Sequence, residues 1–277
     1  MRPVILHGHI FKNAGTTLDW SLGRVFGSCF LDHRQDREML DEGMRHVERL
    51  LRDNESLSAL SSHHMPVVRT NLPGVTLLPL YLVRHPLERI VSVYEFERKQ
   101  EADTPGARAA GSKSFQEYVR WRMDPSVAPV VRNYQTLYLA GAHSLARQRE
   151  VGMTQLLDAV DTLRGYALVG VVERYDESMV CFEEALREYF PGIDLACIPQ
   201  NVAAVSRGAE GATSAPGART LRQLDDELRS TVIDHNGYDL SVYTMANELL
   251  DARIRGIADF AGKLARFRQR CRELYVH

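Results

Sequence analysis

The residues best suited to chemistry lie near the start of the chain, in the segment HIFKNAGTT at residues 9–17. An apolar run precedes this segment and helical spacing of apolar residues follows it. A strand, a tight turn and a helix N-terminus together form an anion site, because the first backbone amides of a helix have no partner within the helix. Lys12 adds a positive charge, and Thr16 and Thr17 add hydroxyl donors. The segment is therefore predicted to be an anion-binding loop, the phosphate loop (residues 9–17).

The spacing within the phosphate loop argues against triphosphate chemistry. A nucleoside triphosphatase loop reads G-x-x-x-x-G-K-[ST], with the lysine directly after the last glycine. In this chain Thr16 follows Gly15, and Lys12 stands before that glycine. Binding of a magnesium–triphosphate is therefore not indicated. Taken alone, the segment also fits a plain strand-to-helix turn with a solvated lysine.

A second candidate is the histidine pair His63-His64, which follows the short run LSALSS and precedes Pro66. The run predicts a short strand, and the proline ends regular structure. In an open parallel sheet, ligands collect at the carboxyl ends of the strands. Imidazole titrates near neutral pH and can act as a general base there. Without further context, a pair of surface or hydrogen-bonded histidines is the alternative.

A third candidate begins at Arg84, at the end of a predicted strand over 76–84. Pro86 marks the start of the next helix, where its missing N–H does no harm, and Ser92 lies about two turns along that helix. Arginine offers a forked donor that suits phosphate oxygens, and serine adds a hydroxyl. The alternative is an arginine at a strand end and a serine packed on a helix.

Together these segments resemble the sulfotransferases, and in particular the carbohydrate branch related to heparan sulfate 2-O-sulfotransferase. Residues 9–17 are similar to its 5′-phosphosulfate loop, roughly H-I-P-K-T-G-G-T-S, with Phe11 in place of proline and Ala14 in place of glycine. Residues 84–92 resemble its 3′-phosphate motif, an Arg-x-Pro-x-x-Arg stretch followed by a serine. Weaker similarities lie at 132–137, 169–178 and 239–243. The methyl group of Ala14 stands where the loop requires close backbone approach.

The resemblance implies an α/β, P-loop-like three-layer sandwich with a mostly parallel central sheet flanked by helices. It implies 3′-phosphoadenosine-5′-phosphosulfate (PAPS) as donor, PAP as product, and in-line transfer of the sulfuryl group to an acceptor hydroxyl without a metal. His63 is the first candidate for the base, His64 is the second, and Lys12 stabilises charge during transfer. The residues implied to bind the donor are Lys12, Asn13, Ala14, Gly15, Thr16, Thr17, Arg84, Ser92 and Arg207.

The acceptor is expected to be a saccharide or glycolipid, with smaller alcohols left open, because loop residues set that choice. Two other functions stay open. One is a small-molecule kinase of the P-loop type, against which the missing G-K-[ST] speaks. The other is a non-catalytic nucleotide-binding protein. Arg207 is the least supported donor contact, because its Gly-, Ala- and Ser-rich surroundings lack the family's Arg-Lys-Gly.

Charge and cysteine content further narrow the functional classes that the chain could belong to. The chain has 277 residues and a formal net charge of −2, which argues against nucleic-acid binding by bulk charge. None of the four cysteines forms a C-x-x-C pair, and their scatter suits a reducing compartment. No signal peptide or membrane-spanning run is apparent, so we expect a cytoplasmic, bacterial enzyme without integral membrane contact. An anchored enzyme trimmed of its anchor would look the same, and the oligomeric state is left open.

Length and composition predict a single domain over 1–277, with a C-terminal helical region from about 219. Strands are predicted at 4–7, 76–84 and 166–172, and helices at 15–26, 38–52, 115–123 and 221–233. The polar run 32–37 is expected to be a solvated loop. Residues 100–112, rich in glycine, alanine and charge, are expected to form a mobile surface loop. The Arg-rich tail over 252–276 is expected to be a docked surface helix.

Overall fold

The computed structural model describes residues 1–141, 151–165, 167–200 and 216–275. The chain forms two compact units. The first contains Met1–Val83, Val160–Gly208 and Met245–His277, and the second contains Arg84–Ala159 and Ala209–Thr244. The expectation of a single domain stays a prediction. Arg207, the least supported donor contact, lies outside the described residues.

A five-stranded, wholly parallel sheet forms the centre of the first unit, in the order β2-β3-β1-β4-β5. In chain order the strands are β1 (Arg2–Gly8), β2 (Phe30–His33), β3 (Ala59–Ser62), β4 (Val75–Val83) and β5 (Leu168–Val171). His7 of β1 is in register with Ser61 of β3 and with Leu80 of β4. The carboxyl ends of β1 and β3 therefore lie side by side, which sets the phosphate loop beside the histidine pair.

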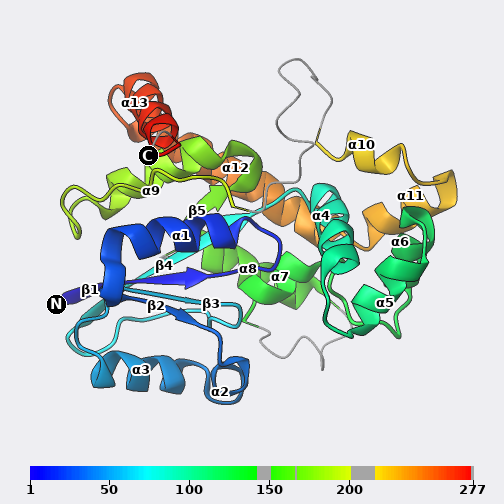
Figure 1. Ribbon diagram of the computed structural model, residues 1–277, viewed down its shortest axis with the longest axis horizontal. Helices are drawn as coiled ribbons and strands as arrows, with labels where there is room; N and C mark the ends of the chain where they lie inside the picture. The colour runs from blue at the N-terminus through cyan, green and yellow to red at the C-terminus, as the bar shows by residue number, and fades with distance from the viewer. Residues whose placement is uncertain (142–150, 166, 201–215, 276–277) are drawn as a thin grey trace. The chain divides into compact units, whose positions relative to one another are not determined.

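Helices cover both faces of this sheet, as Figure 1 shows. On one face, Ile5 packs with apolar residues of α1 (Gly15–Phe26), α9 (Tyr175–Leu186) and α13 (Phe260–Glu273). On the other, Val4 and Leu6 pack with residues of α2 (Asp36–Glu42) and α3 (Met44–Asp53). Successive side chains of a strand point to opposite faces, which accounts for this alternation along β1. The three-layer α/β sandwich predicted from the sequence is confirmed.

Helices make up the second unit within the described residues. They are α4 (Pro86–Lys99), α5 (Pro105–Ser112), α6 (Phe115–Met123), α7 (Tyr134–Leu139), α10 (Ala218–Leu221) and α11 (Asp226–Asp234), and α8 (Met153–Arg164) and α12 (Gly237–Gly256) each contribute to both units. Arg89 of α4 is only 1% exposed, and its guanidinium lies 4.2 Å from the centre of the Tyr134 ring. It also donates to the carbonyl of Val130 at 2.8 Å. This second arginine of the 84–92 motif thus stabilises the packing of its own unit.

Several local predictions were wrong. The run 32–37 is not a solvated loop, because β2 extends to the buried His33 and α2 begins at Asp36. The helix expected over 38–52 is split at Gly43, whose φ of 56° breaks it. The loop expected over 100–112 contains α5, because the Thr104 hydroxyl accepts from the Ala107 N–H and caps the helix. The helix expected over 221–233 starts later, because α10 ends at Leu221 and α11 begins at Asp226, after its N-cap Asp225.

Candidate functional site

The phosphate loop connects β1 to α1 through two residues in left-handed backbone conformations, Lys12 (φ 65°) and Ala14 (φ 59°). Ala14 is the N-cap of α1 and makes no side-chain cap hydrogen bond. The first turn of α1 contains no acidic residue. The positive end of the helix is therefore neither capped nor neutralised by its own side chains, which is the condition for anion binding.

Contacts within the first unit fix the shape of the loop. The buried Asn13 donates from Nδ2 to the carbonyl of Leu82 on β4 at 2.7 Å. The Thr17 hydroxyl accepts from the backbone N–H of Gln200 at 3.0 Å, whereas Thr16 is exposed. Gly15 has no room for a side chain, since a Cβ there would lie 2.2 Å from Cδ2 of His9. The requirement for glycine at this position therefore comes from the ring of His9.

His63 follows β3 and faces the same ring. Its Nδ1 lies 3.0 Å from the carbonyl oxygen of His9, and the two ring centres are 4.1 Å apart. A carbonyl oxygen can only accept, so we assign the proton of neutral His63 to Nδ1 and the lone pair to Nε2. Burial and the neighbouring His9 lower the pKa of His63 to about 4. At pH 7 the imidazole is neutral and able to take a proton at Nε2.

His64 lies in a different environment. Its Nε2 is 3.8 Å from a carboxylate oxygen of Asp36 at the start of α2, and its backbone N–H donates to the Ser62 hydroxyl at 3.2 Å. Burial lowers its pKa. The described contacts therefore join His63 to the phosphate loop through His9, and join His64 to α2.

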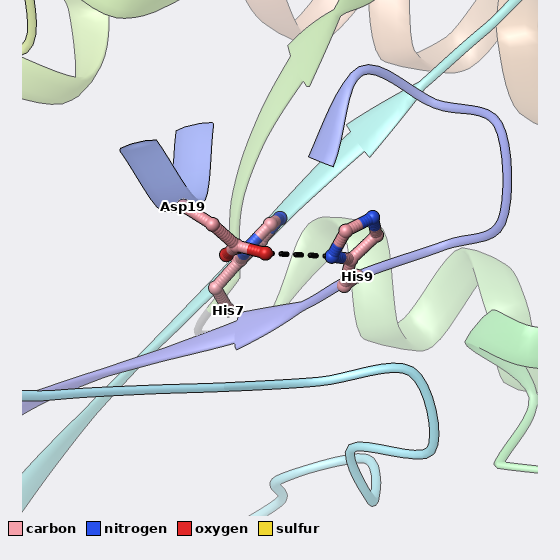
Figure 2. Close-up of side chains that lie close together, drawn as sticks. All are labelled: His7, His9 and Asp19. Atoms are coloured by element: carbon pink, nitrogen blue, oxygen red, sulfur yellow. Dashed lines mark hydrogen bonds and ion pairs between the residues drawn. The ribbon is translucent and has the colours of Figure 1, made fainter. Parts of the chain in front are cut away.

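Three buried residues in or next to the phosphate loop were not predicted from the sequence as part of the site: His7, His9 and Asp19. Figure 2 shows the two rings against the carboxylate of Asp19. Nδ1 of His7 lies 2.7 Å from Oδ1, and Nδ1 of His9 lies 2.7 Å from Oδ2. Burial alone would raise the pKa of Asp19, but the electrostatic interaction with His7 and the hydrogen bonds from both rings outweigh it and hold that pKa well below its usual range.

Two sequence signals pointed to this cluster. The pattern H-x-H at the end of a strand puts both rings on one face of the sheet. Asp19 is a carboxylate one turn into a helix whose neighbouring positions are apolar, and a buried carboxylate requires partners. The three potential ligand atoms lie within 4.8 Å of one another, a spacing that could also hold a metal ion. The absence of a metal from the function stays a prediction.

In the second unit, the backbone N–H and carbonyl of Arg84 are both hydrogen-bonded by the side chain of Gln135. Gln135 accepts from the Arg84 N–H through Oε1 and donates to the Arg84 carbonyl through Nε2, both at 2.8 Å. Asp239, which is fully buried, accepts from the backbone N–H groups of Gln135 and Thr136 at 3.1 and 2.8 Å. The weak similarities at 132–137 and 239–243 thereby acquire a structural role, because they fix the main chain at Arg84.

Ser92 lies on α4 and is half-buried. The predicted donor-binding residues are thus divided between the units. Lys12 through Thr17, with His63 and His64, lie in the first, and Arg84 and Ser92 lie in the second. Each group is supported by contacts within its own unit.

A family model described as the sulfotransferase family matches residues 2–245. This chain belongs to the sulfotransferase family. The match spans the phosphate loop, His63 and the Arg84 motif, and it confirms the resemblance drawn from the sequence. The sulfotransferase is also 32% identical over 206 residues to an uncharacterized protein of Archaeoglobus fulgidus, an alignment covering 73% of this chain and 80% of the relative. The cytoplasmic location and the bacterial source stay predictions.

Among the helices that the structure describes in this sulfotransferase, none combines the length and the apolar character needed to span a bilayer.

Proposed function

We propose that this sulfotransferase transfers the sulfuryl group of PAPS to a hydroxyl of a carbohydrate or glycoconjugate, with His63 as the general base. The observation that carries the proposal is the contact between the base and the phosphate loop. His63 is held by the main chain and ring of His9, and the ring of His9 packs against Gly15 at the start of α1. A neutral imidazole therefore lies next to an uncapped helix N-terminus, as acceptor activation beside a phosphosulfate requires.

The phosphate loop fits the 5′ end of the donor. The N-terminus of α1 carries no capping side chain and no acidic residue, so its amides can donate to anionic oxygens. Lys12 supplies a full positive charge, and the Thr17 hydroxyl, which accepts from Gln200, keeps its own proton available for donation. These groups would stabilise the negative charge that develops on the departing 5′-phosphate.

Arg84 and Ser92 would bind the 3′-phosphate, the group that distinguishes PAPS from ATP. The guanidinium supplies paired, charge-assisted donors, and serine supplies a hydroxyl. Gln135 holds both backbone groups of Arg84, so less conformational freedom is lost when a phosphate binds.

The bond changes then balance without a metal. PAPS supplies an electrophilic sulfur and a phosphate leaving group. The acceptor oxygen forms a bond to sulfur as the bond between sulfur and the 5′-phosphate oxygen breaks, and PAP is released. His63 takes the acceptor proton at Nε2, while Lys12 and the loop amides stabilise the leaving group. In-line group transfer of this kind depends mainly on positioning and charge stabilisation.

Transfer of ³⁵S from labelled PAPS to a panel of oligosaccharides, glycolipids and simple alcohols tests the proposal. We expect label on a saccharide-containing acceptor with the wild type, loss with His63→Ala, and retention with His64→Ala as the matched control. Phosphate transfer from ATP with magnesium, and no sulfate transfer to any acceptor, would contradict the proposal and support a kinase. Unchanged transfer by His63→Ala would contradict the assignment of the base.

A further inference from the structure

Four polar side chains form a continuous row at the start of the phosphate loop: His7, Asp19, His9 and His63. The carboxylate of Asp19 lies between the rings of His7 and His9, with 2.7 Å from an oxygen to each Nδ1. The ring of His9 then lies against that of His63, with centres 4.1 Å apart. His7 and Asp19 make no contact with His63 within the described residues, so their effect on the base passes through His9, or through Arg34, which pairs with Asp19 and also acts on His63.

The hydrogen bonds of the row fix where the protons are. The low pKa of Asp19 keeps its carboxylate ionised, and an ionised carboxylate can only accept. Nδ1 of His9 must therefore carry a proton, which leaves the lone pair on Nε2. His63 has the same tautomer because its Nδ1 faces the carbonyl of His9. Asp19 thus determines the tautomer and the ring orientation of His9.

A fixed His9 ring has two consequences for the site. The ring fills the space beside Gly15, where a Cβ would approach its Cδ2 to 2.2 Å, and so it limits how the first turn of α1 can move. It also forms the surface on which His63 rests. If the ring turned, both the loop and the base would lose a contact at once.

We propose that Asp19 is a positioning residue, which acts through His9 to hold His63 and the phosphate loop in their reactive arrangement. This inference rests on the proposed function, because it assigns Asp19 a role in sulfuryl transfer. Asp19 touches the phosphate loop at His9, away from the donor-binding groups Lys12 to Thr17, and its effect is therefore predicted on turnover more than on donor binding.

The charges of the cluster favour this role over a metal site. Both Nδ1 atoms already donate to Asp19, and each would have to lose its proton to bind a cation. The guanidinium of Arg34 also lies 3.4 Å from Oδ2 of Asp19, where it supplies the positive charge that a metal would bring. The hydrogen bonds of the carboxylate are therefore satisfied by protein groups.

The test compares Asp19→Asn with Asp32→Asn. Asp32 is a matched control, because it is an exposed carboxylate that pairs with the same Arg34 and touches no histidine in the described contacts. An amide in place of the Asp19 carboxylate presents a donor to one of the two rings, which reverses the tautomer of that ring. We expect kcat to fall about 10- to 100-fold in Asp19→Asn, as for other groups that orient a functional imidazole, with the Kd for PAP changed less than about threefold. Asp32→Asn should retain wild-type kcat.

A second readout does not depend on activity. Nitrogen-15 NMR of histidine-labelled wild type should show His9 and His63 protonated at Nδ1, and Asp19→Asn should move His7 or His9 to the Nε2-protonated form. The proposal is overturned if wild-type His9 carries its proton on Nε2, if kcat survives in Asp19→Asn, or if the purified protein holds a stoichiometric metal on these nitrogens. If the wild type transfers sulfate to no acceptor but both tautomer results are as expected, the proposed function fails, whereas the hydrogen-bonded arrangement of Asp19, His9 and His63 is supported.

Discussion

The phosphate loop of the first unit and the Arg84 segment of the second are built in opposite ways. In the phosphate loop the groups proposed to bind an anion include main-chain amides, and the buried side chains around them, His7, His9 and Asp19, lie close by in the sequence. In the second unit the group proposed to bind an anion is the side chain of Arg84. Its backbone is held by Gln135, which is bonded in turn by Asp239, and both lie far along the chain. A motif can therefore be contiguous in the sequence while the residues that hold it are far away. Substitutions in the phosphate loop and at the Arg84 segment should therefore have separable effects on activity and binding.

The largest effect is expected in the first unit, from His63→Ala. Removal of a positioned general base costs about 10²- to 10⁴-fold in rate, and we expect a loss of kcat in that range. Calorimetry should show PAP binding within a few fold of wild type, since Nε2 of His63 acts on the acceptor. The ring of His64 lies near Asp36, and His64→Ala should therefore keep most of the activity. A comparable loss in both variants would contradict the distinction between the two histidines.

The second prediction concerns pH and the stability of the same unit. His63 titrates near 6.5 when unfolded and at about 4 when folded, so the unfolded state binds more protons between these values and stability falls as the pH drops through that window. His9 and Arg34 act on His63 to lower its pKa, and Asp36 acts to raise it. The contribution of His63 is at most about 3 kcal/mol. Urea unfolding at pH 7 and pH 4.5 should show a smaller difference for His63→Gln than for wild type; equal differences would sink the prediction.

A smaller effect is expected from Gln135→Leu in the second unit. The substitution leaves the N–H and carbonyl of Arg84 without their side-chain partner, and we expect PAP affinity to fall about 10-fold. Binding of AMP, which lacks the 3′-phosphate, should be unchanged. Gln116→Leu is the matched control, because Gln116 bonds Asp225 at the start of α11. Equal weakening of PAP and AMP would show that Gln135 supports the fold and not the 3′-phosphate site.

The smallest effect is expected from Ala14→Gly. Ala14 adopts a left-handed conformation, which costs a residue with a Cβ roughly 1–2 kcal/mol. Glycine avoids this cost, but it also increases the entropy of the unfolded chain, which offsets part of the stabilisation. We expect stabilisation of less than about 1 kcal/mol. Asn133 is also left-handed, but its side chain accepts from the N–H groups of Tyr238 and Asp239 at 3.0 Å, so Asn133→Gly should destabilise. Thermal unfolding of both variants checks this contrast, and a lower Tm for Ala14→Gly would contradict it.

Much of the fold could be predicted because its signals are local. The helices at 15–26 and 115–123 have the bounds read from their spacing. The prediction of a loop over 100–112 was wrong because it relied on amino-acid composition. The Thr104-Pro105 pair that starts α5 is a capping signal visible in the sequence. At the site, the H-x-H spacing and Asp19 could have been noticed. The hydrogen bonds from Gln135 to the backbone of Arg84 could not have been predicted, because they join residues far apart in the chain.

The most direct test of the account is a calorimetric comparison of PAP with AMP, on wild type and on Arg84→Ala. The two ligands differ by the 3′-phosphate alone, so their ratio of affinities measures the site assigned to Arg84 and Ser92. Charge-assisted hydrogen bonds of about 1.5–3 kcal/mol predict that wild type prefers PAP by about 10- to 100-fold. Arg84→Ala should lose that preference and still bind AMP as wild type does. A preference for PAP that survives in Arg84→Ala, or binding of ATP with magnesium in place of PAP, would contradict the account.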